Sequence, residues 1–158
     1  MEMGEIVIQN INQVYHNENL GDFNALSDIN LRLRKGENLA VEGESGSGKS
    51  TLARLLIGLE KPTSGKILLD GEDITCWNYR TWKQHRKKIQ AVFQDSSGTL
   101  NPARSAYANV EEALVNLTDQ KKPERKKHIL DLMDAVHMDY RLLETPVRQL
   151  SGGEQQRV

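Results

Sequence analysis

The stretch GESGSGKST, residues 43–51, has the composition of a loop that wraps around a charged ligand. A triphosphate needs many hydrogen-bond donors within a small radius. Backbone N–H groups supply them where a curled loop runs into a helix N-terminus. The chain can curl this tightly only where residues lack a Cβ, as in Gly43, Gly46 and Gly48. This spacing predicts a phosphate-binding loop.

Two further side chains of this stretch carry chemistry that a nucleotide requires. Lys49 would place a positive charge on the β- and γ-phosphates, which makes it a candidate catalytic residue, and the Ser50 hydroxyl is suited to ligate Mg²⁺. The candidate nucleotide-binding residues are Gly43, Glu44, Ser45, Gly46, Ser47, Gly48, Lys49, Ser50 and Thr51.

The sequence on either side of the loop fits a strand–loop–helix unit. Residues 38–41, NLAV, are a short and mostly apolar run that predicts a buried strand. After the loop, leucines recur at the i, i+3, i+4, i+7 spacing of one helix face. They are Leu52, Leu55, Leu56 and Leu59. The alternative is a glycine-rich turn that arose by chance, and these flanks make it the weaker interpretation.

Length and composition are those of one globular domain. The 158 residues are enough to bury a core, and the formal net charge of −1 gives no overall field towards nucleic acid or anionic lipid. The basic run at 81–88 is interpreted as a solvated face.

The single cysteine, Cys76, cannot form an internal disulfide, which suits a reducing compartment. Because the sequence shows neither a signal peptide nor a membrane-spanning run, we expect membrane association only through a partner.

Hydrophobic periodicity predicts a strand-rich first part of the chain. Apolar residues alternate or run together in four short segments. These predicted strands are 6–11, 29–33, 67–69 and 89–93. Residues 16–24 are polar and predict a loop, whereas Asp70–Gly71 is a strong hairpin-turn signal.

Helical periodicity dominates the later part of the chain. Helices are predicted at 106–118 and 124–138. The second has an apolar stripe that we expect to face the core. The stripe consists of Ile129, Leu132, Met133 and Val136. We therefore expect an α/β protein, with a mixed part from residue 1 to 94 and a helical part from 95 to 150.

A second motif suited to a phosphate is LSGGE, at residues 150–154. Ser151 is a good helix N-cap, and Gly152 and Gly153 form a small-residue turn before a helix that should start near Glu154. The exposed amides of such a turn would suit a phosphate. Alone, the motif would be interpreted as a helix cap. Two phosphate-suited helix starts, far apart in one chain, favour a dimer with shared nucleotide sites.

With both motifs, the chain resembles the ATP-binding subunits of ABC transporters over nearly its whole length. GESGSGKST is similar to their Walker A motif, and LSGGEQQR, residues 150–157, to the signature motif that contacts ATP across a dimer. Gln94 matches the Q-loop glutamine, which the resemblance implies is a catalytic residue near Mg²⁺ and the attacking water. Tyr15 lies where the family has an aromatic residue stacked on adenine. The alternative for Tyr15 is an ordinary half-buried tyrosine, with Phe23 the other aromatic nearby.

The resemblance also implies a fold and a set of site residues. The fold is a P-loop ATPase core with an antiparallel β subdomain and a helical subdomain. In the family, the signature of one subunit contacts the ATP held by the other. The implied contact residues are Leu150, Ser151, Gly152, Gly153 and Glu154.

The stretch FQDSSGTLNPARS, residues 93–105, narrows the resemblance. It is similar to the pattern of importer subunits for oligopeptides, dipeptides, nickel and metal–chelator complexes. Such a subunit hydrolyses ATP with Mg²⁺ to drive uptake. It pairs with a second ABC ATPase subunit and two membrane permease subunits, and it serves a substrate-binding protein indirectly. The implied location is peripheral, at the cytoplasmic face of the cell membrane, with no nucleic-acid partner.

In the family, the signature is followed by a Walker B aspartate, a catalytic glutamate, a D-loop and a switch histidine. Residues 151–158 hold only the signature and the start of its helix, so the resemblance implies a domain incomplete at its C-terminus. From these residues alone we expect at most weak ATP binding and no sustained turnover. Two alternatives are a non-hydrolysing truncated module and a soluble ABC ATPase acting on DNA or ribosomes. The second would need long arms between the two motifs, and this helical segment is short.

Overall fold

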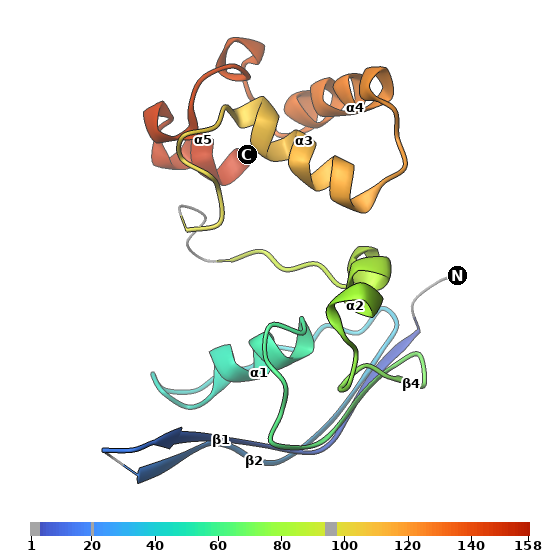
Figure 1. Ribbon diagram of the computed structural model, residues 1–158, viewed down its shortest axis with the longest axis vertical. Helices are drawn as coiled ribbons and strands as arrows, with labels where there is room; N and C mark the ends of the chain where they lie inside the picture. Colours follow the sequence, from blue (N-terminus) through green and yellow to red (C-terminus); the bar gives the residue numbers. More distant parts are fainter. Residues whose placement is uncertain (1–3, 20, 94–97) are drawn as a thin grey trace. The chain divides into compact units, whose positions relative to one another are not determined.

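The computed structural model describes residues 4–19, 21–93 and 98–158. The chain divides into two compact units, Met1–Gln90 and Ala91–Val158. Among the described residues, every strand belongs to the first unit, and the second unit is helical (Figure 1).

A four-stranded antiparallel sheet forms the base of the first unit. The strands are β1 (Glu5–Asn17), β2 (Gly21–Arg34), β3 (Ser64–Leu69) and β4 (Glu72–Asp73). Their order across the sheet is β2-β1-β3-β4, so β1 pairs on both sides. The three predicted strands within β1, β2 and β3 are confirmed.

The turn between β3 and β4 is the predicted Asp70–Gly71 hairpin. Asp70 and Gly71 have φ angles of 54° and 82°. Positive φ at both central residues belongs to the tight turn whose twist matches that of paired strands. The Asp70 carboxylate also accepts hydrogen bonds from the N–H groups of Gly4 and Glu5, at 2.6 and 3.1 Å, and these lower its pKa. The turn therefore ties β3 to the start of β1.

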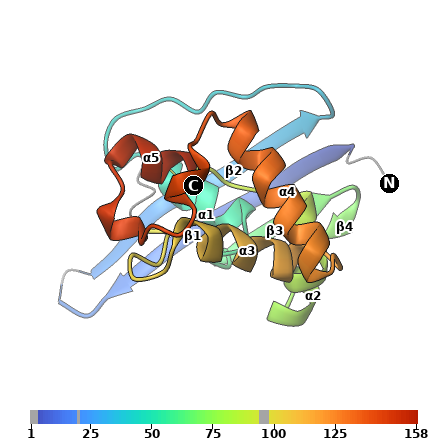
Figure 2. The ribbon, with the colours of Figure 1, turned by 90° about the horizontal axis from the view of Figure 1, so that it is seen from above.

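Two helices cover one face of the sheet, α1 (Lys49–Leu56) and α2 (Tyr79–His85) (Figures 1 and 2). Ile8 of β1 and Leu55 of α1 are each 1% exposed, and burial of such a side chain stabilises the fold by about 1.5–3 kcal/mol. Among the described residues, the buried core of this unit consists of Ile8, Ile11, Leu26, Leu52, Leu55, Ile67, Leu69, Ile74, Trp77 and Trp82.

The predicted loop at 16–24 is wrong, because β1 continues to Asn17 and β2 begins at Gly21. The two strands stay paired to the end of the hairpin, where His16 lies opposite Asp22. Their side chains are in contact, with His16 Nδ1 2.7 Å from Asp22 Oδ1. Backbone pairing and this cross-strand contact therefore extend the strands despite their polar composition.

Two other strand predictions are also wrong. Residues 38–41 and 89–93 have neither strand nor helix conformation. Leu39 and Val41 are about half exposed, at 48% and 49%, and Val92 is fully exposed. A strand requires a neighbour that supplies its ladder hydrogen bonds, and no described residue pairs with either run.

The second unit is built from short helices around its own core. They are α3 (Ala106–Leu117), α4 (Lys122–Ala135) and α5 (Gly152–Arg157), with 3-10 turns at Tyr140–Leu142 and Val147–Gln149. The predicted helices at 106–118 and 124–138 are confirmed to within a few residues. The core of this unit consists of Ala106, Leu114, Ile129, Met133, Met138, Leu143, Val147 and Leu150.

The apolar stripe of α4 is only half buried, which corrects the prediction for this helix. Ile129 and Met133 are 0% and 3% exposed, whereas Leu132 and Val136 are 39% and 37% exposed. The core of this unit touches one narrow side of α4, so residues at the edge of the stripe stay in contact with solvent.

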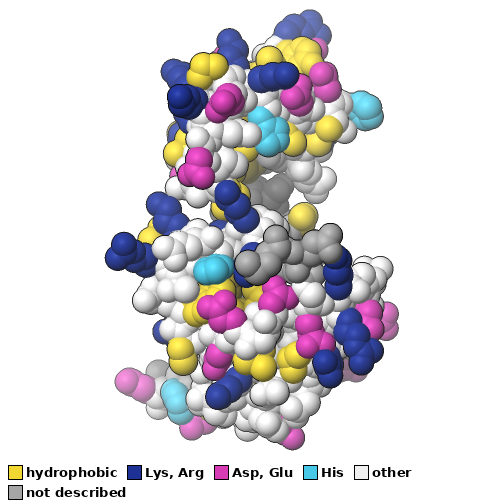
Figure 3. Space-filling view, turned by 90° about the vertical axis from the view of Figure 1, so that its right-hand side faces the viewer, with side chains coloured by type: hydrophobic (Ala, Val, Ile, Leu, Met, Phe, Trp, Pro, Cys, Tyr) yellow, Lys and Arg dark blue, Asp and Glu magenta, His cyan; other side chains and the backbone are white. Residues whose placement is uncertain are grey.

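The surface is mixed in charge. Figure 3 shows basic and acidic side chains interspersed on one face, in agreement with the formal net charge of −1. Of the helices in the described ranges, none has the length and apolar character needed to span a bilayer.

Candidate nucleotide-binding site

The predicted phosphate loop leads directly into α1. The Leu52 N–H donates to the Gly48 carbonyl oxygen at 2.9 Å, which starts the helical hydrogen-bond pattern. Gly48 has a φ of 90°, a left-handed conformation that costs a residue with a Cβ about 1–2 kcal/mol. A Cβ at this position would also lie 2.4 Å from the carbonyl oxygen of Ala25 on β2. Glycine therefore lets the end of the loop rest against β2.

The ammonium group of Lys49 lies across the loop. Its Nζ donates to the carbonyl oxygens of Gly43 and Glu44, at 2.7 and 2.6 Å, and to Ser47 Oγ at 3.3 Å. These partners are neutral, so they do not cancel the positive charge. The charge adds to the partial positive charge of the α1 N-terminus, whose first N–H groups have no helical acceptor. The loop is therefore suited to bind an anion.

A cavity of about 520 Å³ lies between the loop and β2. Residues 45–51 line it together with Phe23 and Ala25. Ser50 is exposed at this cavity, whereas Thr51 is buried. The volume falls within the roughly 300–1,000 Å³ of small-molecule sites. Most of the predicted loop residues therefore meet at one cavity, and the other two, Gly43 and Glu44, accept hydrogen bonds from Lys49.

Tyr15, the predicted adenine-stacking residue, does not line this cavity. Its side chain is half-buried, and its hydroxyl donates to Glu60 Oε2 at 2.5 Å. Phe23 lies opposite Tyr15 in the β1–β2 register and lines the cavity instead. Two aromatic residues near the hairpin end were visible in the sequence, but only the lining of the cavity shows which one borders the loop.

The predicted signature residues lie in the second unit, at the start of α5. Ser151 Oγ accepts from the Glu154 N–H at 3.4 Å. In return, Glu154 Oε2 accepts from the Ser151 N–H and hydroxyl at 2.7 and 2.8 Å. These hydrogen bonds lower the pKa of the Glu154 carboxyl. Leu150 is buried in the core of this unit and anchors the motif. With Ser151 as the N-cap, the helix starts at Gly152, two residues before the predicted Glu154.

Gly152 and Gly153 are not required by the packing of this chain. A Cβ added at either would meet nothing within 4 Å, and neither residue has a left-handed φ. Glycine in a helix is about 1 kcal/mol less favourable than alanine. What the two glycines do provide is open access to the N–H groups of the first turn of α5.

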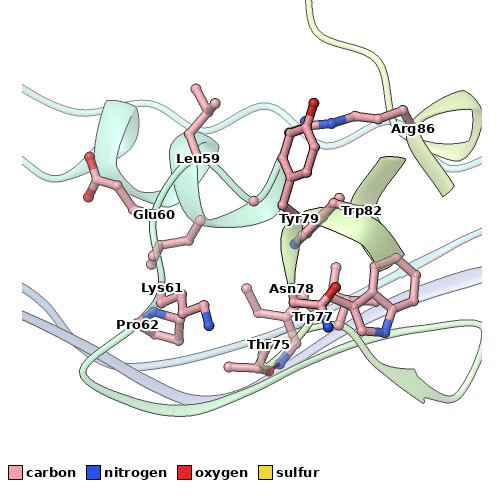
Figure 4. A pocket seen from close by; sticks show the side chains of 14 residues that line it. Leu59, Glu60, Lys61, Pro62, Thr75, Trp77, Asn78, Tyr79, Trp82 and Arg86 are labelled. Carbon is pink, nitrogen blue, oxygen red and sulfur yellow. Dashed lines mark hydrogen bonds between the residues drawn. The ribbon is translucent and has the colours of Figure 1, made fainter. Parts of the chain in front are cut away.

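A second cavity, of about 430 Å³, lies beside α2 in the first unit (Figure 4). Trp77 and Trp82 meet edge to face with ring centroids 5.2 Å apart, and the Arg86 guanidinium lies 5.3 Å from the Trp82 ring centroid. Arg86 also donates to the Ile57 carbonyl oxygen at 3.1 Å. The sequence marked Trp82 and Arg86 only as members of the basic run at 81–88, which was interpreted as a solvated face, whereas the Trp82 side chain is buried.

The family of the protein follows from comparison with known proteins. The sequence profile of the ABC transporter family matches residues 26–158. The chain belongs to the ABC transporter family. It is 38% identical over 160 residues to the nickel import ATP-binding protein NikE of Escherichia coli (strain K12). That alignment covers 97% of this chain and 60% of the relative, so the chain spans about 60% of the relative's length.

Solved structures of ABC cassettes have the same fold. The dimeric structure of MJ0796, a bacterial ABC transporter cassette, superposes with a TM-score of 0.85 at 32% identity. A post-hydrolysis dimeric state of the same cassette, bound to ADP and Pi, superposes with a TM-score of 0.84. Each match covers 96% of this chain and 66% of the other chain. The predicted fold class is thus confirmed as an ABC ATPase fold of which this chain holds a part.

Of the two predicted Mg²⁺ ligands, Ser50 lies within the described residues. Gln94, the predicted Q-loop residue, lies outside the described residues. Within the described ranges, no group of three or more His, Cys, Asp or Glu side chains could hold a metal ion. The exposed Ser50 hydroxyl at the cavity does fit, because Mg²⁺ accepts few protein oxygens when phosphates complete its shell.

Proposed function

We propose that this chain is the nucleotide-binding part of an ABC importer subunit that couples ATP binding and hydrolysis to uptake. The observation that carries the proposal is the position of Lys49, whose uncancelled charge meets the α1 N-terminus at a cavity lined by residues 45–51. A triphosphate is the ligand that needs this combination of backbone donors and one cation.

The predicted phosphate-loop, Mg²⁺ and signature residues each have a role in the proposal. Lys49 and the loop N–H groups bind the β- and γ-phosphates, while Ser50 and Gln94 hold Mg²⁺. Bound Mg²⁺ neutralises charge on the phosphate oxygens during transfer. The signature residues Leu150–Glu154 of one subunit meet the ATP held by another, and the open first turn of α5 supports this role.

The partners follow from the family and from the relatives. MJ0796 forms dimers, and we infer a second ABC ATPase subunit for this chain. Two membrane permease subunits would hold the pair as peripheral proteins at the cytoplasmic face of the cell membrane, with a substrate-binding protein as an indirect partner. The net charge of −1 supports the absence of a nucleic-acid partner. The imported substrate is nickel, a peptide or a metal–chelator complex, and the likeness to NikE favours nickel.

Isothermal titration calorimetry with ATP and Mg²⁺ tests the binding function. Lys49→Ala should weaken ATP binding at least about tenfold, because a hydrogen bond to a charged group contributes roughly 1.5–3 kcal/mol. Lys66→Ala removes an exposed lysine from β3 and serves as the matched control with unchanged affinity. Equal affinity of the Lys49 and Lys66 variants would contradict the proposal.

The transported substrate needs a cellular measurement. Uptake of radioactive nickel, a dipeptide and a nickel–chelator complex would be compared between cells with the unaltered gene and cells with Lys49→Ala. We expect nickel uptake to fall in the variant. If only dipeptide uptake fell, the chain would instead be assigned to the peptide importers.

A further inference from the structure

The pairing of β1 with β2 is interrupted at three places on the way to the phosphate loop. At the first, β1 has one extra residue between Ile8 and Ile11. At the second, β2 has one extra residue between Leu26 and Ile29, which cancels the first shift. At the third, Ala25 of β2 has no partner in the described β1–β2 register. Each interruption is a β-bulge, in which an extra residue bends the strand and redirects the side chains beyond it.

The first two bulges direct side chains into the core. Ile8 and Ile11 are three positions apart, and a regular strand would send them to opposite faces of the sheet. Both are nevertheless buried, at 1% and 0% exposure. Leu26 and Ile29 have the same spacing, and both pack in the core of the first unit. Because a shift of one residue turns a strand segment over, loss of the second bulge would turn Leu26 towards solvent.

Asn10 lies in the first bulge and Asp28 in the second. Their φ angles are 50° and 47°, in the left-handed region that Asn and Asp tolerate better than other residues with a Cβ. The Asn10 side-chain amide donates to Asp28 Oδ1 at 2.8 Å, which joins the two bulges directly. The Asn10 N–H donates to Asn30 Oδ1 at 2.9 Å. The Asp28 N–H donates to Asn12 Oδ1, also at 2.9 Å. Side chains of the opposite strand therefore accept from the backbone N–H of each left-handed residue.

Beyond the second bulge, β2 approaches the phosphate loop. The carbonyl oxygen of Ala25 and the Cδ2 of Leu26 lie 2.4 and 2.8 Å from the point that a Cβ on Gly48 would occupy. Gly48 is followed by Lys49, the first residue of α1. The place of the loop against the sheet therefore depends on where the bulges leave Ala25 and Leu26.

We propose that Asn10 and Asp28 are positioning residues for the phosphate loop. Both are exposed, and neither lines the loop cavity, so they act neither by burial nor by contact with the ligand. Their linked bulges fix the register that holds Ala25 and Leu26 against Gly48. The inference rests on the proposed nucleotide binding and adds to it the part of the sheet that holds the binding loop in place.

The test is the affinity of Asp28 variants for inorganic tripolyphosphate with Mg²⁺, measured by calorimetric titration of the full chain. Asp28→Ala should bind about tenfold more weakly, because alanine disfavours the left-handed backbone and depopulates the register that holds the loop. Asp28→Asn keeps both the acceptor and the tolerance of this backbone, so it should bind like the unaltered chain. Asp28→Gly keeps the backbone and loses the acceptor, so its affinity should lie between those of the unaltered chain and Asp28→Ala. It also serves as the test variant if Asp28→Ala does not fold.

The matched control is Asp70→Ala in the turn between β3 and β4. Asp70 is also left-handed, with a φ of 54°, and its carboxylate also accepts two hydrogen bonds, from the Gly4 and Glu5 N–H groups. Asp70→Ala should lower the urea midpoint about as much as Asp28→Ala does, yet leave tripolyphosphate affinity unchanged. A residue with a merely structural role lowers the midpoint without weakening binding by the folded chain.

A double variant tests whether Asp28 acts through Gly48. If it does, Asp28→Ala combined with Gly48→Ala should bind tripolyphosphate no more weakly than Gly48→Ala alone, because the contact that Asp28 supports is already lost. Losses of affinity that multiply in the double variant would overturn the route through Gly48.

The remaining outcomes separate this inference from the proposed function. Unchanged affinity in Asp28→Ala and Asp28→Gly, with binding by the unaltered chain, overturns the inference alone. Equal losses of affinity in Asp28→Ala and Asp70→Ala also overturn it, because general destabilisation would then explain both. Failure of the unaltered chain to bind tripolyphosphate overturns the inference together with the proposed function.

Discussion

The carbonyl oxygen of Ala25 lies 2.4 Å from the point that a Cβ on Gly48 would occupy. The backbone of β2 therefore passes close to Gly48, the residue immediately before Lys49 in the phosphate loop. A Cβ at Gly48 would also come within 2.8 Å of Leu26 Cδ2. The loop is thus placed by a backbone contact that only glycine permits, and the position of the Lys49 ammonium group depends on it.

Gly48→Ala should lower both the stability of the chain and its affinity for phosphate. The φ of 90° costs alanine about 1–2 kcal/mol, and relief of the contact with β2 adds about 1–3 kcal/mol. Tripolyphosphate affinity should fall as well, because the loop must move away from β2. Urea denaturation followed by circular dichroism measures the first effect, and calorimetric titration the second.

Gly36→Ala is the matched control for this prediction. Gly36 also has a left-handed φ, of 79°, but a Cβ there would meet nothing within 4 Å. Its alanine variant should lose only the conformational contribution of about 1–2 kcal/mol and bind tripolyphosphate normally. If both variants lost the same stability, the contact between Gly48 and Ala25 would have no energetic weight.

Features that depend on neighbouring residues in the sequence were predictable. The left-handed Gly48 and the Asp70–Gly71 turn follow from backbone sterics at single residues, and Ser151 caps α5 through residues three positions away. The order of strands, in contrast, is fixed by partners far along the chain. Residues 38–41 are apolar enough for a strand, yet no described strand pairs with them.

The position of Phe23 in the candidate site could not be predicted from the sequence for the same reason. Tyr15 matched a family pattern, whereas Phe23 belonged to a polar segment that predicted a loop. The cross-strand pairing of Tyr15 with Phe23, and the hydrogen bond that joins Tyr15 to Glu60, bring together residues that local periodicity cannot relate. A register that is fixed by the hairpin as a whole has no signature in either strand alone.

Gly58→Ala should destabilise the first unit through Trp82. Gly58 has a φ of 68°, and a Cβ would lie 2.2 Å from two ring carbons of Trp82. The indole would have to leave its place between Trp77 and Arg86, and overpacking of this kind costs about 1–3 kcal/mol in addition to the backbone strain. Tryptophan fluorescence should shift to longer wavelength at lower urea concentration than in the unaltered chain.

The control for Gly58 is Gly71→Ala. Gly71 has a φ of 82° with nothing within 4 Å of a Cβ, so it reports backbone strain without overpacking. Its urea midpoint should fall less, and the fluorescence of the folded state should not change. A folded-state spectrum of Gly58→Ala identical to that of the unaltered chain would show that Trp82 does not need to move.

Ser151→Ala should destabilise the second unit by about 1 kcal/mol, the usual effect of losing an N-cap. The variant loses the hydrogen bonds between Ser151 Oγ and Glu154 at the start of α5. Ser105→Ala is a comparable change, because Ser105 Oγ accepts from the Ala108 N–H at 3.2 Å to cap α3. Both variants should therefore lose similar stability near neutral pH when measured by urea denaturation.

The same two serine variants should differ in acid. Hydrogen bonds from Ser151 lower the pKa of Glu154 in the folded chain from its ordinary value of 4.5. A lowered folded-state pKa contributes stability above the unfolded value, and this contribution is lost as the pH falls through the folded value. Ser151→Ala removes the hydroxyl hydrogen bond, the largest cause of the shift, and keeps the backbone N–H, so the part of its destabilisation that comes from Glu154 should be full at pH 7 and should shrink below about pH 4.5. Ser105 caps a helix whose third residue is Ala108, without a carboxylate, so its variant should show no such change. Urea denaturation at pH 7 and pH 3 distinguishes the two, and parallel losses at both pH values would mean that the Ser151–Glu154 hydrogen bonds are not formed in solution.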